Sequence, residues 1–172
     1  MSQLDPTGTR VRVYTFAEGM FSRLAHDLEI DAPITEATGE LDAAGDGHLD
    51  VSFRAGSLRV VGFVKKGVTD EHGPSESDRA DILERLLAAL GATAESTIRA
   101  RVDKKAGRVS VDLEVPTGRA KADASIREDG GAMVARLRYS MPTLGMKPVK
   151  GPLGAFRLAD HVEVEVRAKT RQ

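Results

Sequence analysis

The chain has 172 residues, 25 Lys and Arg against 26 Asp and Glu, a formal net charge of −1, and no cysteine. A chain of this length buries roughly 70% of its unfolded surface, so we expect one domain spanning residues 1–172. The balanced, dispersed charge argues against a nucleic-acid partner. The lack of cysteine excludes disulfides, thiolate metal sites and cysteine nucleophiles.

The sequence predicts no membrane span, because none of its apolar runs approaches the ~20 residues that a spanning helix needs. The first ten residues show neither the basic segment nor the apolar run of a secretory signal. We therefore expect a soluble, cytoplasmic protein.

Period-two alternation of apolar and polar residues dominates the chain, and this period places one buried and one solvated row on a strand. Nine segments show it: 10–16, 22–30, 34–41, 48–53, 96–103, 109–115, 118–126, 132–140 and 162–167. The polar stretch 103–107 ends in Gly107 and joins two of them, which predicts a hairpin.

Short connections between most of these segments favour an antiparallel sheet over parallel strands joined by crossover helices. Closure into a barrel would remove the exposed edges of such a sheet. A two-sheet sandwich stays possible, because periodicity alone does not separate the two folds. We expect a mainly β fold, an antiparallel β-barrel with one α-helix.

The polar segment 62–78 has no periodicity and is long for a connection, which is typical either of a lid or of a mobile loop. The next segment has helical spacing and predicts a helix over about 77–90. Ser77 and Asp78 are candidates for its N-terminal cap, and Gly91 ends it. Its apolar stripe must cover either the barrel wall or, as we prefer, an open barrel end.

Small side chains mark several apolar rows, among them the alternating Ala120, Ala122 and Ala124. Such a row either leaves room for a ligand inside the barrel or allows a neighbouring element to pack closely, and the two explanations have equal weight. The aromatic content is only 4%, without Trp, which favours an aliphatic ligand over a sugar or a base.

The four histidines show no metal-binding spacing, and there is no nucleophile elbow of the GxSxG type. We expect no metal, no cofactor and no catalytic residue. His26 shares a predicted strand face with Leu24, Leu28 and Ile30, where a lone histidine is usually a hydrogen-bonded core residue. It is also a possible polar anchor.

Four stretches together resemble the YceI-like family: YTFAEGMFSRLAHDLEI, the strand SLRV, the helix RADILERLL and the closing LGMKPVKGPLGAFRLADHVEVEVR. Within them, the family's pattern matches Ser22, His26-Asp27, Gly145-Met146-Lys147-Pro148, Leu153-Gly154 and Asp160-His161-Val162. The resemblance implies an extended lipocalin-like antiparallel barrel with a helix near one end, a long isoprenoid or other amphiphilic lipid in its interior, and often a homodimer. Many relatives are exported, whereas we expect this chain to lack a signal sequence. Its Ala-rich stretch VPTGRAKADASI also departs from the family's apolar strand.

The leading hypothesis is a non-catalytic carrier that holds an apolar or amphiphilic small molecule inside the barrel, with the segment 62–78 or the helix gating access. The expected lining residues are Leu24, His26, Leu28, Ile98, Ala100, Leu113, Ala122, Ala124 and Leu137. One alternative is a filled barrel that acts through its surface as an interaction or stress-response module. A less favoured alternative is an enzyme that uses His26 and Asp27 inside the cavity.

Overall fold

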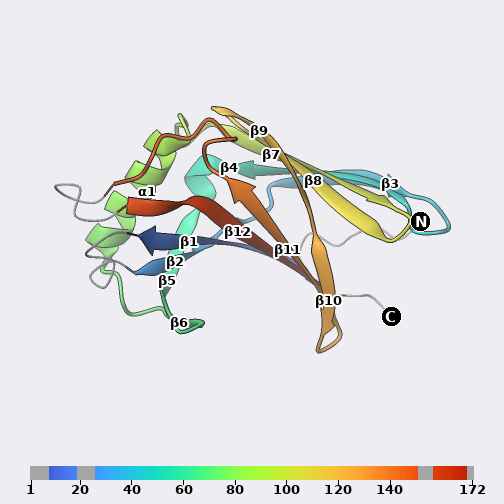
Figure 1. The fold of residues 1–172 in the computed structure, drawn as a ribbon, viewed down its shortest axis with the longest axis horizontal. Helices are drawn as coiled ribbons and strands as arrows, with labels where there is room; N and C mark the ends of the chain where they lie inside the picture. Colours follow the sequence, from blue (N-terminus) through green and yellow to red (C-terminus); the bar gives the residue numbers. More distant parts are fainter. Residues whose placement is uncertain (1–7, 19–25, 151–156, 170–172) are drawn as a thin grey trace.

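The computed structural model describes residues 8–18, 26–150 and 157–169, and it shows two antiparallel sheets with one helix (Figure 1). A seven-stranded sheet has the order β10-β11-β12-β1-β2-β5-β6, and a five-stranded sheet has the order β3-β4-β7-β8-β9. The elements are β1 (Thr9–Glu18), β2 (Asp27–Asp31), β3 (Glu36–Leu41), β4 (Gly47–Arg54), the 3-10 turn η2 (Ala55–Ser57), β5 (Arg59–Lys65), β6 (Val68–Asp70), α1 (Glu76–Ala89), β7 (Thr97–Lys105), β8 (Arg108–Val115), β9 (Gly118–Asp123), β10 (Ser125–Asp129), β11 (Ala132–Ser140) and β12 (Arg157–Lys169).

The alternating rows do separate a buried face from a solvated one, as the sequence predicts. On β7, Ile98 and Ala100 are buried, whereas Arg99 and Arg101 are exposed. The mainly β, antiparallel architecture with one helix is therefore confirmed. Within the described residues the strand ladders form two sheets and no closed ring is detected, so barrel closure stays a prediction.

The predicted strand 118–126 is in fact two strands in different sheets. β9 pairs with β8, and β10 pairs with β11. Between them, the Ala124 N–H still donates to the Val109 carbonyl at 2.8 Å, and the chain then leaves this sheet for the other. Alternation continues smoothly through such a crossing, so the sequence pattern alone does not reveal it.

The segment 62–78 is not a single loop, contrary to expectation. Its first residues finish β5, which pairs with the short strand β6 in a hairpin. Lys66 and Gly67 form the turn with φ values of 50° and 77°, the positive values that a two-residue hairpin of this kind requires. The same geometry recurs at Ala106 and Gly107, where the predicted hairpin between β7 and β8 is confirmed.

The predicted helix is present, but its N-terminal cap is Ser75 rather than Ser77. The Ser75 hydroxyl accepts the Asp78 N–H at 3.1 Å, and the Asp78 carboxylate accepts the Ser75 N–H at 3.2 Å, a reciprocal capping box. At the other end Gly91, with φ +61°, lets the Ala92 N–H reach the Leu87 carbonyl. This closes the helix in a Schellman motif.

The helix lies across one end of the space between the two sheets (Figure 1). Its buried Leu86 and Leu90 belong to the core that both sheets share. The segment that follows β11 packs beside it, where the Lys147 N–H donates to the Ala89 carbonyl at 3.3 Å and Leu144 is fully buried. In the described part of the chain, no helix has the length and apolar character needed to cross a membrane.

Candidate ligand cavity

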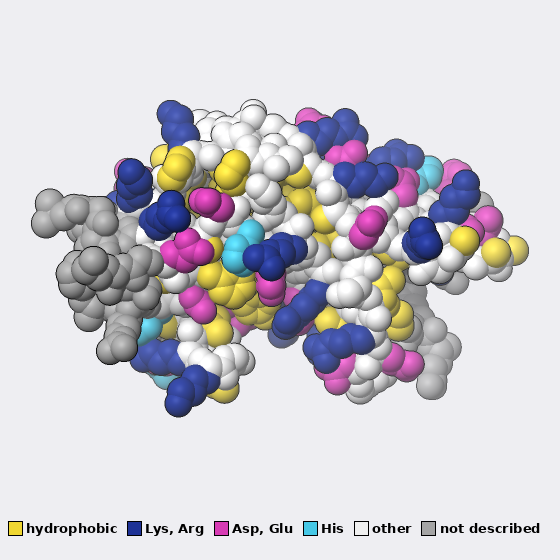
Figure 2. Space-filling view, viewed as in Figure 1, with side chains coloured by type: hydrophobic (Ala, Val, Ile, Leu, Met, Phe, Trp, Pro, Cys, Tyr) yellow, Lys and Arg dark blue, Asp and Glu magenta, His cyan; other side chains and the backbone are white. Residues whose placement is uncertain are grey.

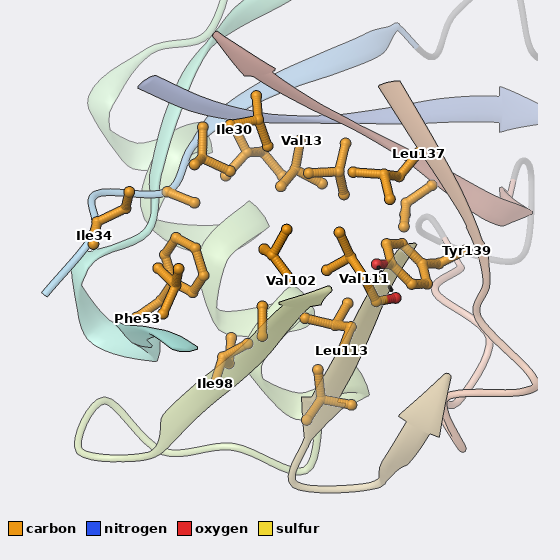
Figure 3. A pocket seen from close by; sticks show the side chains of 18 of the residues that line it. Val13, Ile30, Ile34, Phe53, Ile98, Val102, Val111, Leu113, Leu137 and Tyr139 are labelled. Carbon is orange, nitrogen blue, oxygen red and sulfur yellow. Dashed lines mark hydrogen bonds between the residues drawn. The ribbon is translucent and has the colours of Figure 1, made fainter. Parts of the chain in front are cut away.

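An elongated apolar cavity of about 300 Å³ lies between the two sheets. Its wall consists of aliphatic side chains together with Phe53, Tyr139, two methionines and two threonines, and the described lining contains no Asp, Glu, Lys, Arg or His. The lining residues are Thr9, Val11, Val13, Thr15, Ile30, Ala32, Ile34, Ala37, Leu49, Val51, Phe53, Leu58, Leu86, Leu90, Ile98, Ala100, Val102, Val109, Val111, Leu113, Val115, Ala135, Leu137, Tyr139, Met141, Leu144, Met146, Val162, Val164, Val166 and Ala168. Figure 3 shows how the labelled members converge from both sheets.

The cavity wall follows directly from strand periodicity. On β1, every second residue from Thr9 to Thr15 lines it, and on β12 every second residue from Val162 to Ala168 does so. The two strands are paired, with Val13 opposite Val164, so their inward rows form one continuous apolar surface. The residues between them, such as Arg12, point outward and form ion pairs.

The cavity is closed at the helix end and opens toward the opposite end. Lining residues near α1, such as Thr15, Phe53 and Val162, are buried. Those near the β7–β8 turn, such as Val109 and Ala168, are partly exposed although they face inward. Figure 2 shows hydrophobic side chains in the hollow between the β7–β8 end and the β10–β11 hairpin, with charged side chains dispersed around it.

Tyr139 carries one of the few polar atoms in the cavity wall, and that atom already has a partner. Its hydroxyl donates to the Val111 carbonyl of the facing sheet at 3.0 Å (Figure 3). Burial, with a smaller contribution from the Asp112 charge, raises the pKa of Tyr139 well above its usual value. The hydroxyl therefore remains a neutral donor and bridges the two sheets.

Thr15 carries a polar atom without a partner. The residue is 1% exposed, and its Oγ1 is buried with no hydrogen-bond partner among the described residues. The one other such side-chain atom found there, Arg12 Nε, lies 3.3 Å from the Glu29 carboxylate and so has a favourable charge neighbour. Thr15 thus brings an unused hydroxyl to the closed end of an otherwise apolar cavity.

The structure places four of the nine expected lining residues in the wall: Ile98, Ala100, Leu113 and Leu137. They come from β7, β8 and β11, where alternation correctly identifies the inward row. That they contact a ligand stays a prediction.

Two of the three residues expected from the 22–30 strand, His26 and Leu28, are not in the cavity wall. Leu24 lies outside the described residues. Leu28 is buried but pairs with Thr15, where the cavity ends, and is not part of the wall. His26 lies two positions further along, beyond the closed end, with its ring 4.4 Å from that of Phe63. Leu28 and Ile30 share a buried face of β2, whereas His26 lies before that strand begins.

Ala122 and Ala124 pack against the core but are not lining residues. β9 is the edge of its sheet and lies against β11 of the other sheet. Small side chains permit this close approach, which is the packing explanation that the sequence leaves open beside the cavity explanation.

Sequence reasoning missed the contributions of β1, β12 and the helix. The sequence does contain a signal for the two strands, because apolar and polar residues alternate in both 10–16 and 162–167. What the sequence does not show is that these two strands pair at the centre of the larger sheet, where their inward rows face the other sheet.

His26 and Asp27 have no place in the cavity wall. The Asp27 carboxylate accepts the Ala17 N–H at 2.9 Å, and His26 lies against Phe63. Among the described residues there is no group of three His, Asp or Glu side chains that could hold a metal ion. The geometry therefore gives these two residues a packing and backbone-capping environment.

A second hollow, of about 320 Å³, lies on the outer face of the five-stranded sheet. Its charged groups are largely paired with one another: Arg119 with Asp112 at 2.7 Å, Arg101 with Asp50 at 3.4 Å and Arg99 with Glu114 at 3.9 Å. Such internal pairing leaves little net charge for a ligand, so the apolar cavity is the better candidate site.

No protein-family profile and no curated protein matches this chain. A solved structure does match it: the crystal structure of BcnA from Burkholderia cenocepacia has a TM-score of 0.54, with 11% sequence identity, over 96% of this chain and 98% of BcnA. At this level of identity the likeness concerns the fold alone. The chain therefore shares the fold of BcnA along nearly its whole length.

Proposed function

We propose that the protein is a non-catalytic carrier that holds an apolar or amphiphilic small molecule in the cavity between its sheets. The observation that carries this proposal is the cavity itself, which is lined almost entirely by aliphatic side chains and opens at one end. Removing apolar ligand surface from water would drive binding, at about 25 cal/mol per Å² of buried area before the cost of ordering the ligand.

The shape of the cavity favours a linear ligand. Its wall runs along β1 from Thr9 to Thr15, a distance of about 20 Å at roughly 3.3 Å per residue. A volume of about 300 Å³ over that length suits a single chain rather than a fused-ring system. The resemblance of the sequence to the YceI-like family supports the same class, an isoprenoid or another lipid.

The test is native mass spectrometry of the protein purified without detergent, followed by organic extraction and analysis of lipids. The expected result is a stoichiometric apolar species. Leu113→Glu, which places a carboxylate in the wall, should remove it, because burying an unpaired charge is costly. Thr97→Glu, which places the same carboxylate at an exposed position of β7, should retain it.

The opposite result has a definite meaning. An apo mass for the wild type, together with no uptake of isoprenoid quinones, would reject the carrier function and favour an interaction module that acts through its surface.

A further inference from the structure

The unpartnered Thr15 hydroxyl distinguishes one end of the cavity from the other. Thr15 lies opposite Val162 on β12 and Leu28 on β2, and Tyr139 lies in the same row one strand beyond Val162. This is the last row of paired strand residues in the wall on the side of the helix. Because the Tyr139 hydroxyl is engaged with Val111, Thr15 offers the free hydrogen-bonding group in this row.

A buried hydroxyl without a partner is costly, at about 1–3 kcal/mol by mutational estimates. A β-branched valine would fit the same space and would continue the Val11 and Val13 row of the same strand. The Thr15 hydroxyl is explained if the ligand supplies its hydrogen-bond partner.

Taking the proposed carrier function as given, we propose that Thr15 hydrogen-bonds an uncharged polar group, a hydroxyl or a carbonyl, on the end of the ligand that enters the cavity first. A charged headgroup of either sign does not fit there, because the described lining contains no side chain of opposite charge to pair with it. The ligand class is therefore a long-chain alcohol, ketone or quinone-like carbonyl compound whose polar group lies at the closed end.

The experiment compares decanol with decane, two chains of equal length of which one carries a hydroxyl. Their affinities are measured by displacement of bound N-phenylnaphthylamine from the wild type, Thr15→Val, Thr15→Ser and Thr9→Val. Thr15→Val preserves shape, and Thr15→Ser preserves the hydroxyl. Thr9→Val makes the same substitution at the open end of the same strand.

We expect Thr15→Val to weaken decanol binding about tenfold, which corresponds to one hydrogen bond, and to leave decane binding unchanged. Thr15→Ser should stay within about threefold of the wild type for both probes, since its hydroxyl can still bond. Thr9→Val, at the other end of the cavity wall, should weaken decanol binding less than Thr15→Val does.

Two outcomes would overturn the inference. If Thr15→Val binds decanol as tightly as the wild type, the alcohol lies with its hydroxyl elsewhere, or water satisfies Thr15. If Thr9→Val is the variant that loses decanol, the polar group sits at the open end. In either case decane binding by the wild type would leave the carrier function intact, whereas the failure of both probes on the wild type would reject that function as well.

Discussion

The guanidinium of Arg79 in α1 donates a hydrogen bond of 2.9 Å to the main-chain carbonyl of Val61 in β5. The pairing of β2 with β5 shifts register at this point, with Glu29 opposite Gly62 and Ile30 opposite Val60, so Val61 has no partner across the ladder. Arg79 thus satisfies a carbonyl that the bulge leaves unpaired, and it also reaches the Val60 carbonyl. One side chain thereby fixes the helix to the sheet at the closed end of the cavity.

Replacing Arg79 with Met should lower the free energy of unfolding by about 2–3 kcal/mol, because part-buried carbonyls lose a charged donor. Chemical denaturation measures this loss. Arg85→Met is the matched control on the same helix. Its ion pair with Asp81 is exposed and should contribute less than about 0.5 kcal/mol. Equal losses in the two variants would contradict the anchoring role.

The capping box predicts that replacing Ser75 with Ala destabilises the protein more than replacing Ser77 does. Ser75→Ala removes the acceptor for the Asp78 N–H and should cost about 1 kcal/mol. Ser77→Ala lies within the first turn and should change stability by no more than about 0.5 kcal/mol. Thermal unfolding monitored by circular dichroism distinguishes them, and a larger effect at Ser77 would contradict the observed cap.

Filling the cavity should prevent binding without unfolding the protein. Val102 faces the cavity and is only partly buried, so Val102→Phe should place its ring in the open space and weaken binding of N-phenylnaphthylamine at least tenfold. The cost in stability should remain below about 3 kcal/mol, the upper range for overpacking. Arg101→Phe adds the same ring to the outer face of β7 and should bind the dye normally. Unchanged binding by Val102→Phe would place the dye elsewhere.

Tyr139 should make stability depend on pH in the alkaline range. The pKa of Tyr139 is higher in the folded than in the unfolded state. Its contribution to the free energy of unfolding is therefore complete below about pH 10, the ordinary tyrosine pKa. The contribution is lost as the pH rises above that value toward the raised folded pKa. Tyr139→Phe should cost about 1 kcal/mol at neutral pH through the lost bond to Val111.

The same variant should also show a shallower decline of the unfolding free energy above pH 10 than the wild type does. The decline should not vanish, because burial and the charge of Glu29 also raise the pKa of Tyr14. Denaturation at a series of pH values measures both slopes, and parallel curves for the two proteins would contradict the assignment.

On the outer face of the small sheet, a hydrogen bond from Arg119 lowers the pKa of the Asp112 carboxyl below its usual value. The Nε–Oδ1 distance in this pair is 2.7 Å. In Arg119→Gln the Asp112 pKa should move back toward that of an ordinary aspartate, as measured by the NMR titration of its carboxyl carbon. Arg99→Gln, which affects the more distant pair with Glu114, should leave the Asp112 titration unchanged.

Much of the fold could be predicted from the sequence, because strand alternation and helical spacing are patterns of residues that are close together in the chain. Alternation identifies the inward rows of β7 and β8, and the apolar spacing with Gly91 identifies the helix. The N-terminal cap at Ser75 was not predicted, because Ser75 and Ser77 both lie close to the start of the apolar helical pattern. Only the backbone geometry shows which of them caps the helix.

The cavity could be predicted only in part, because its length and position depend on contacts between distant segments. Ala100 and Ala122 look alike in the sequence as small residues in alternating strands. One faces open space at the centre of its sheet, and the other packs near β11 at the edge. The alternating pattern also does not show where a strand or the cavity wall ends, and His26 lies before β2 begins and outside that wall.

The opening of the cavity lies at the end away from α1 and its Arg79 anchor. A ligand can therefore leave without the helix coming off the sheets, and the hypothesis of a helix that gates access is not favoured by this geometry. Ligand exchange and local unfolding of α1 are then separate processes. The helix amides should stay protected from hydrogen exchange over many cycles of ligand release, and the lifetime of the complex should depend on the apolar wall at the open end.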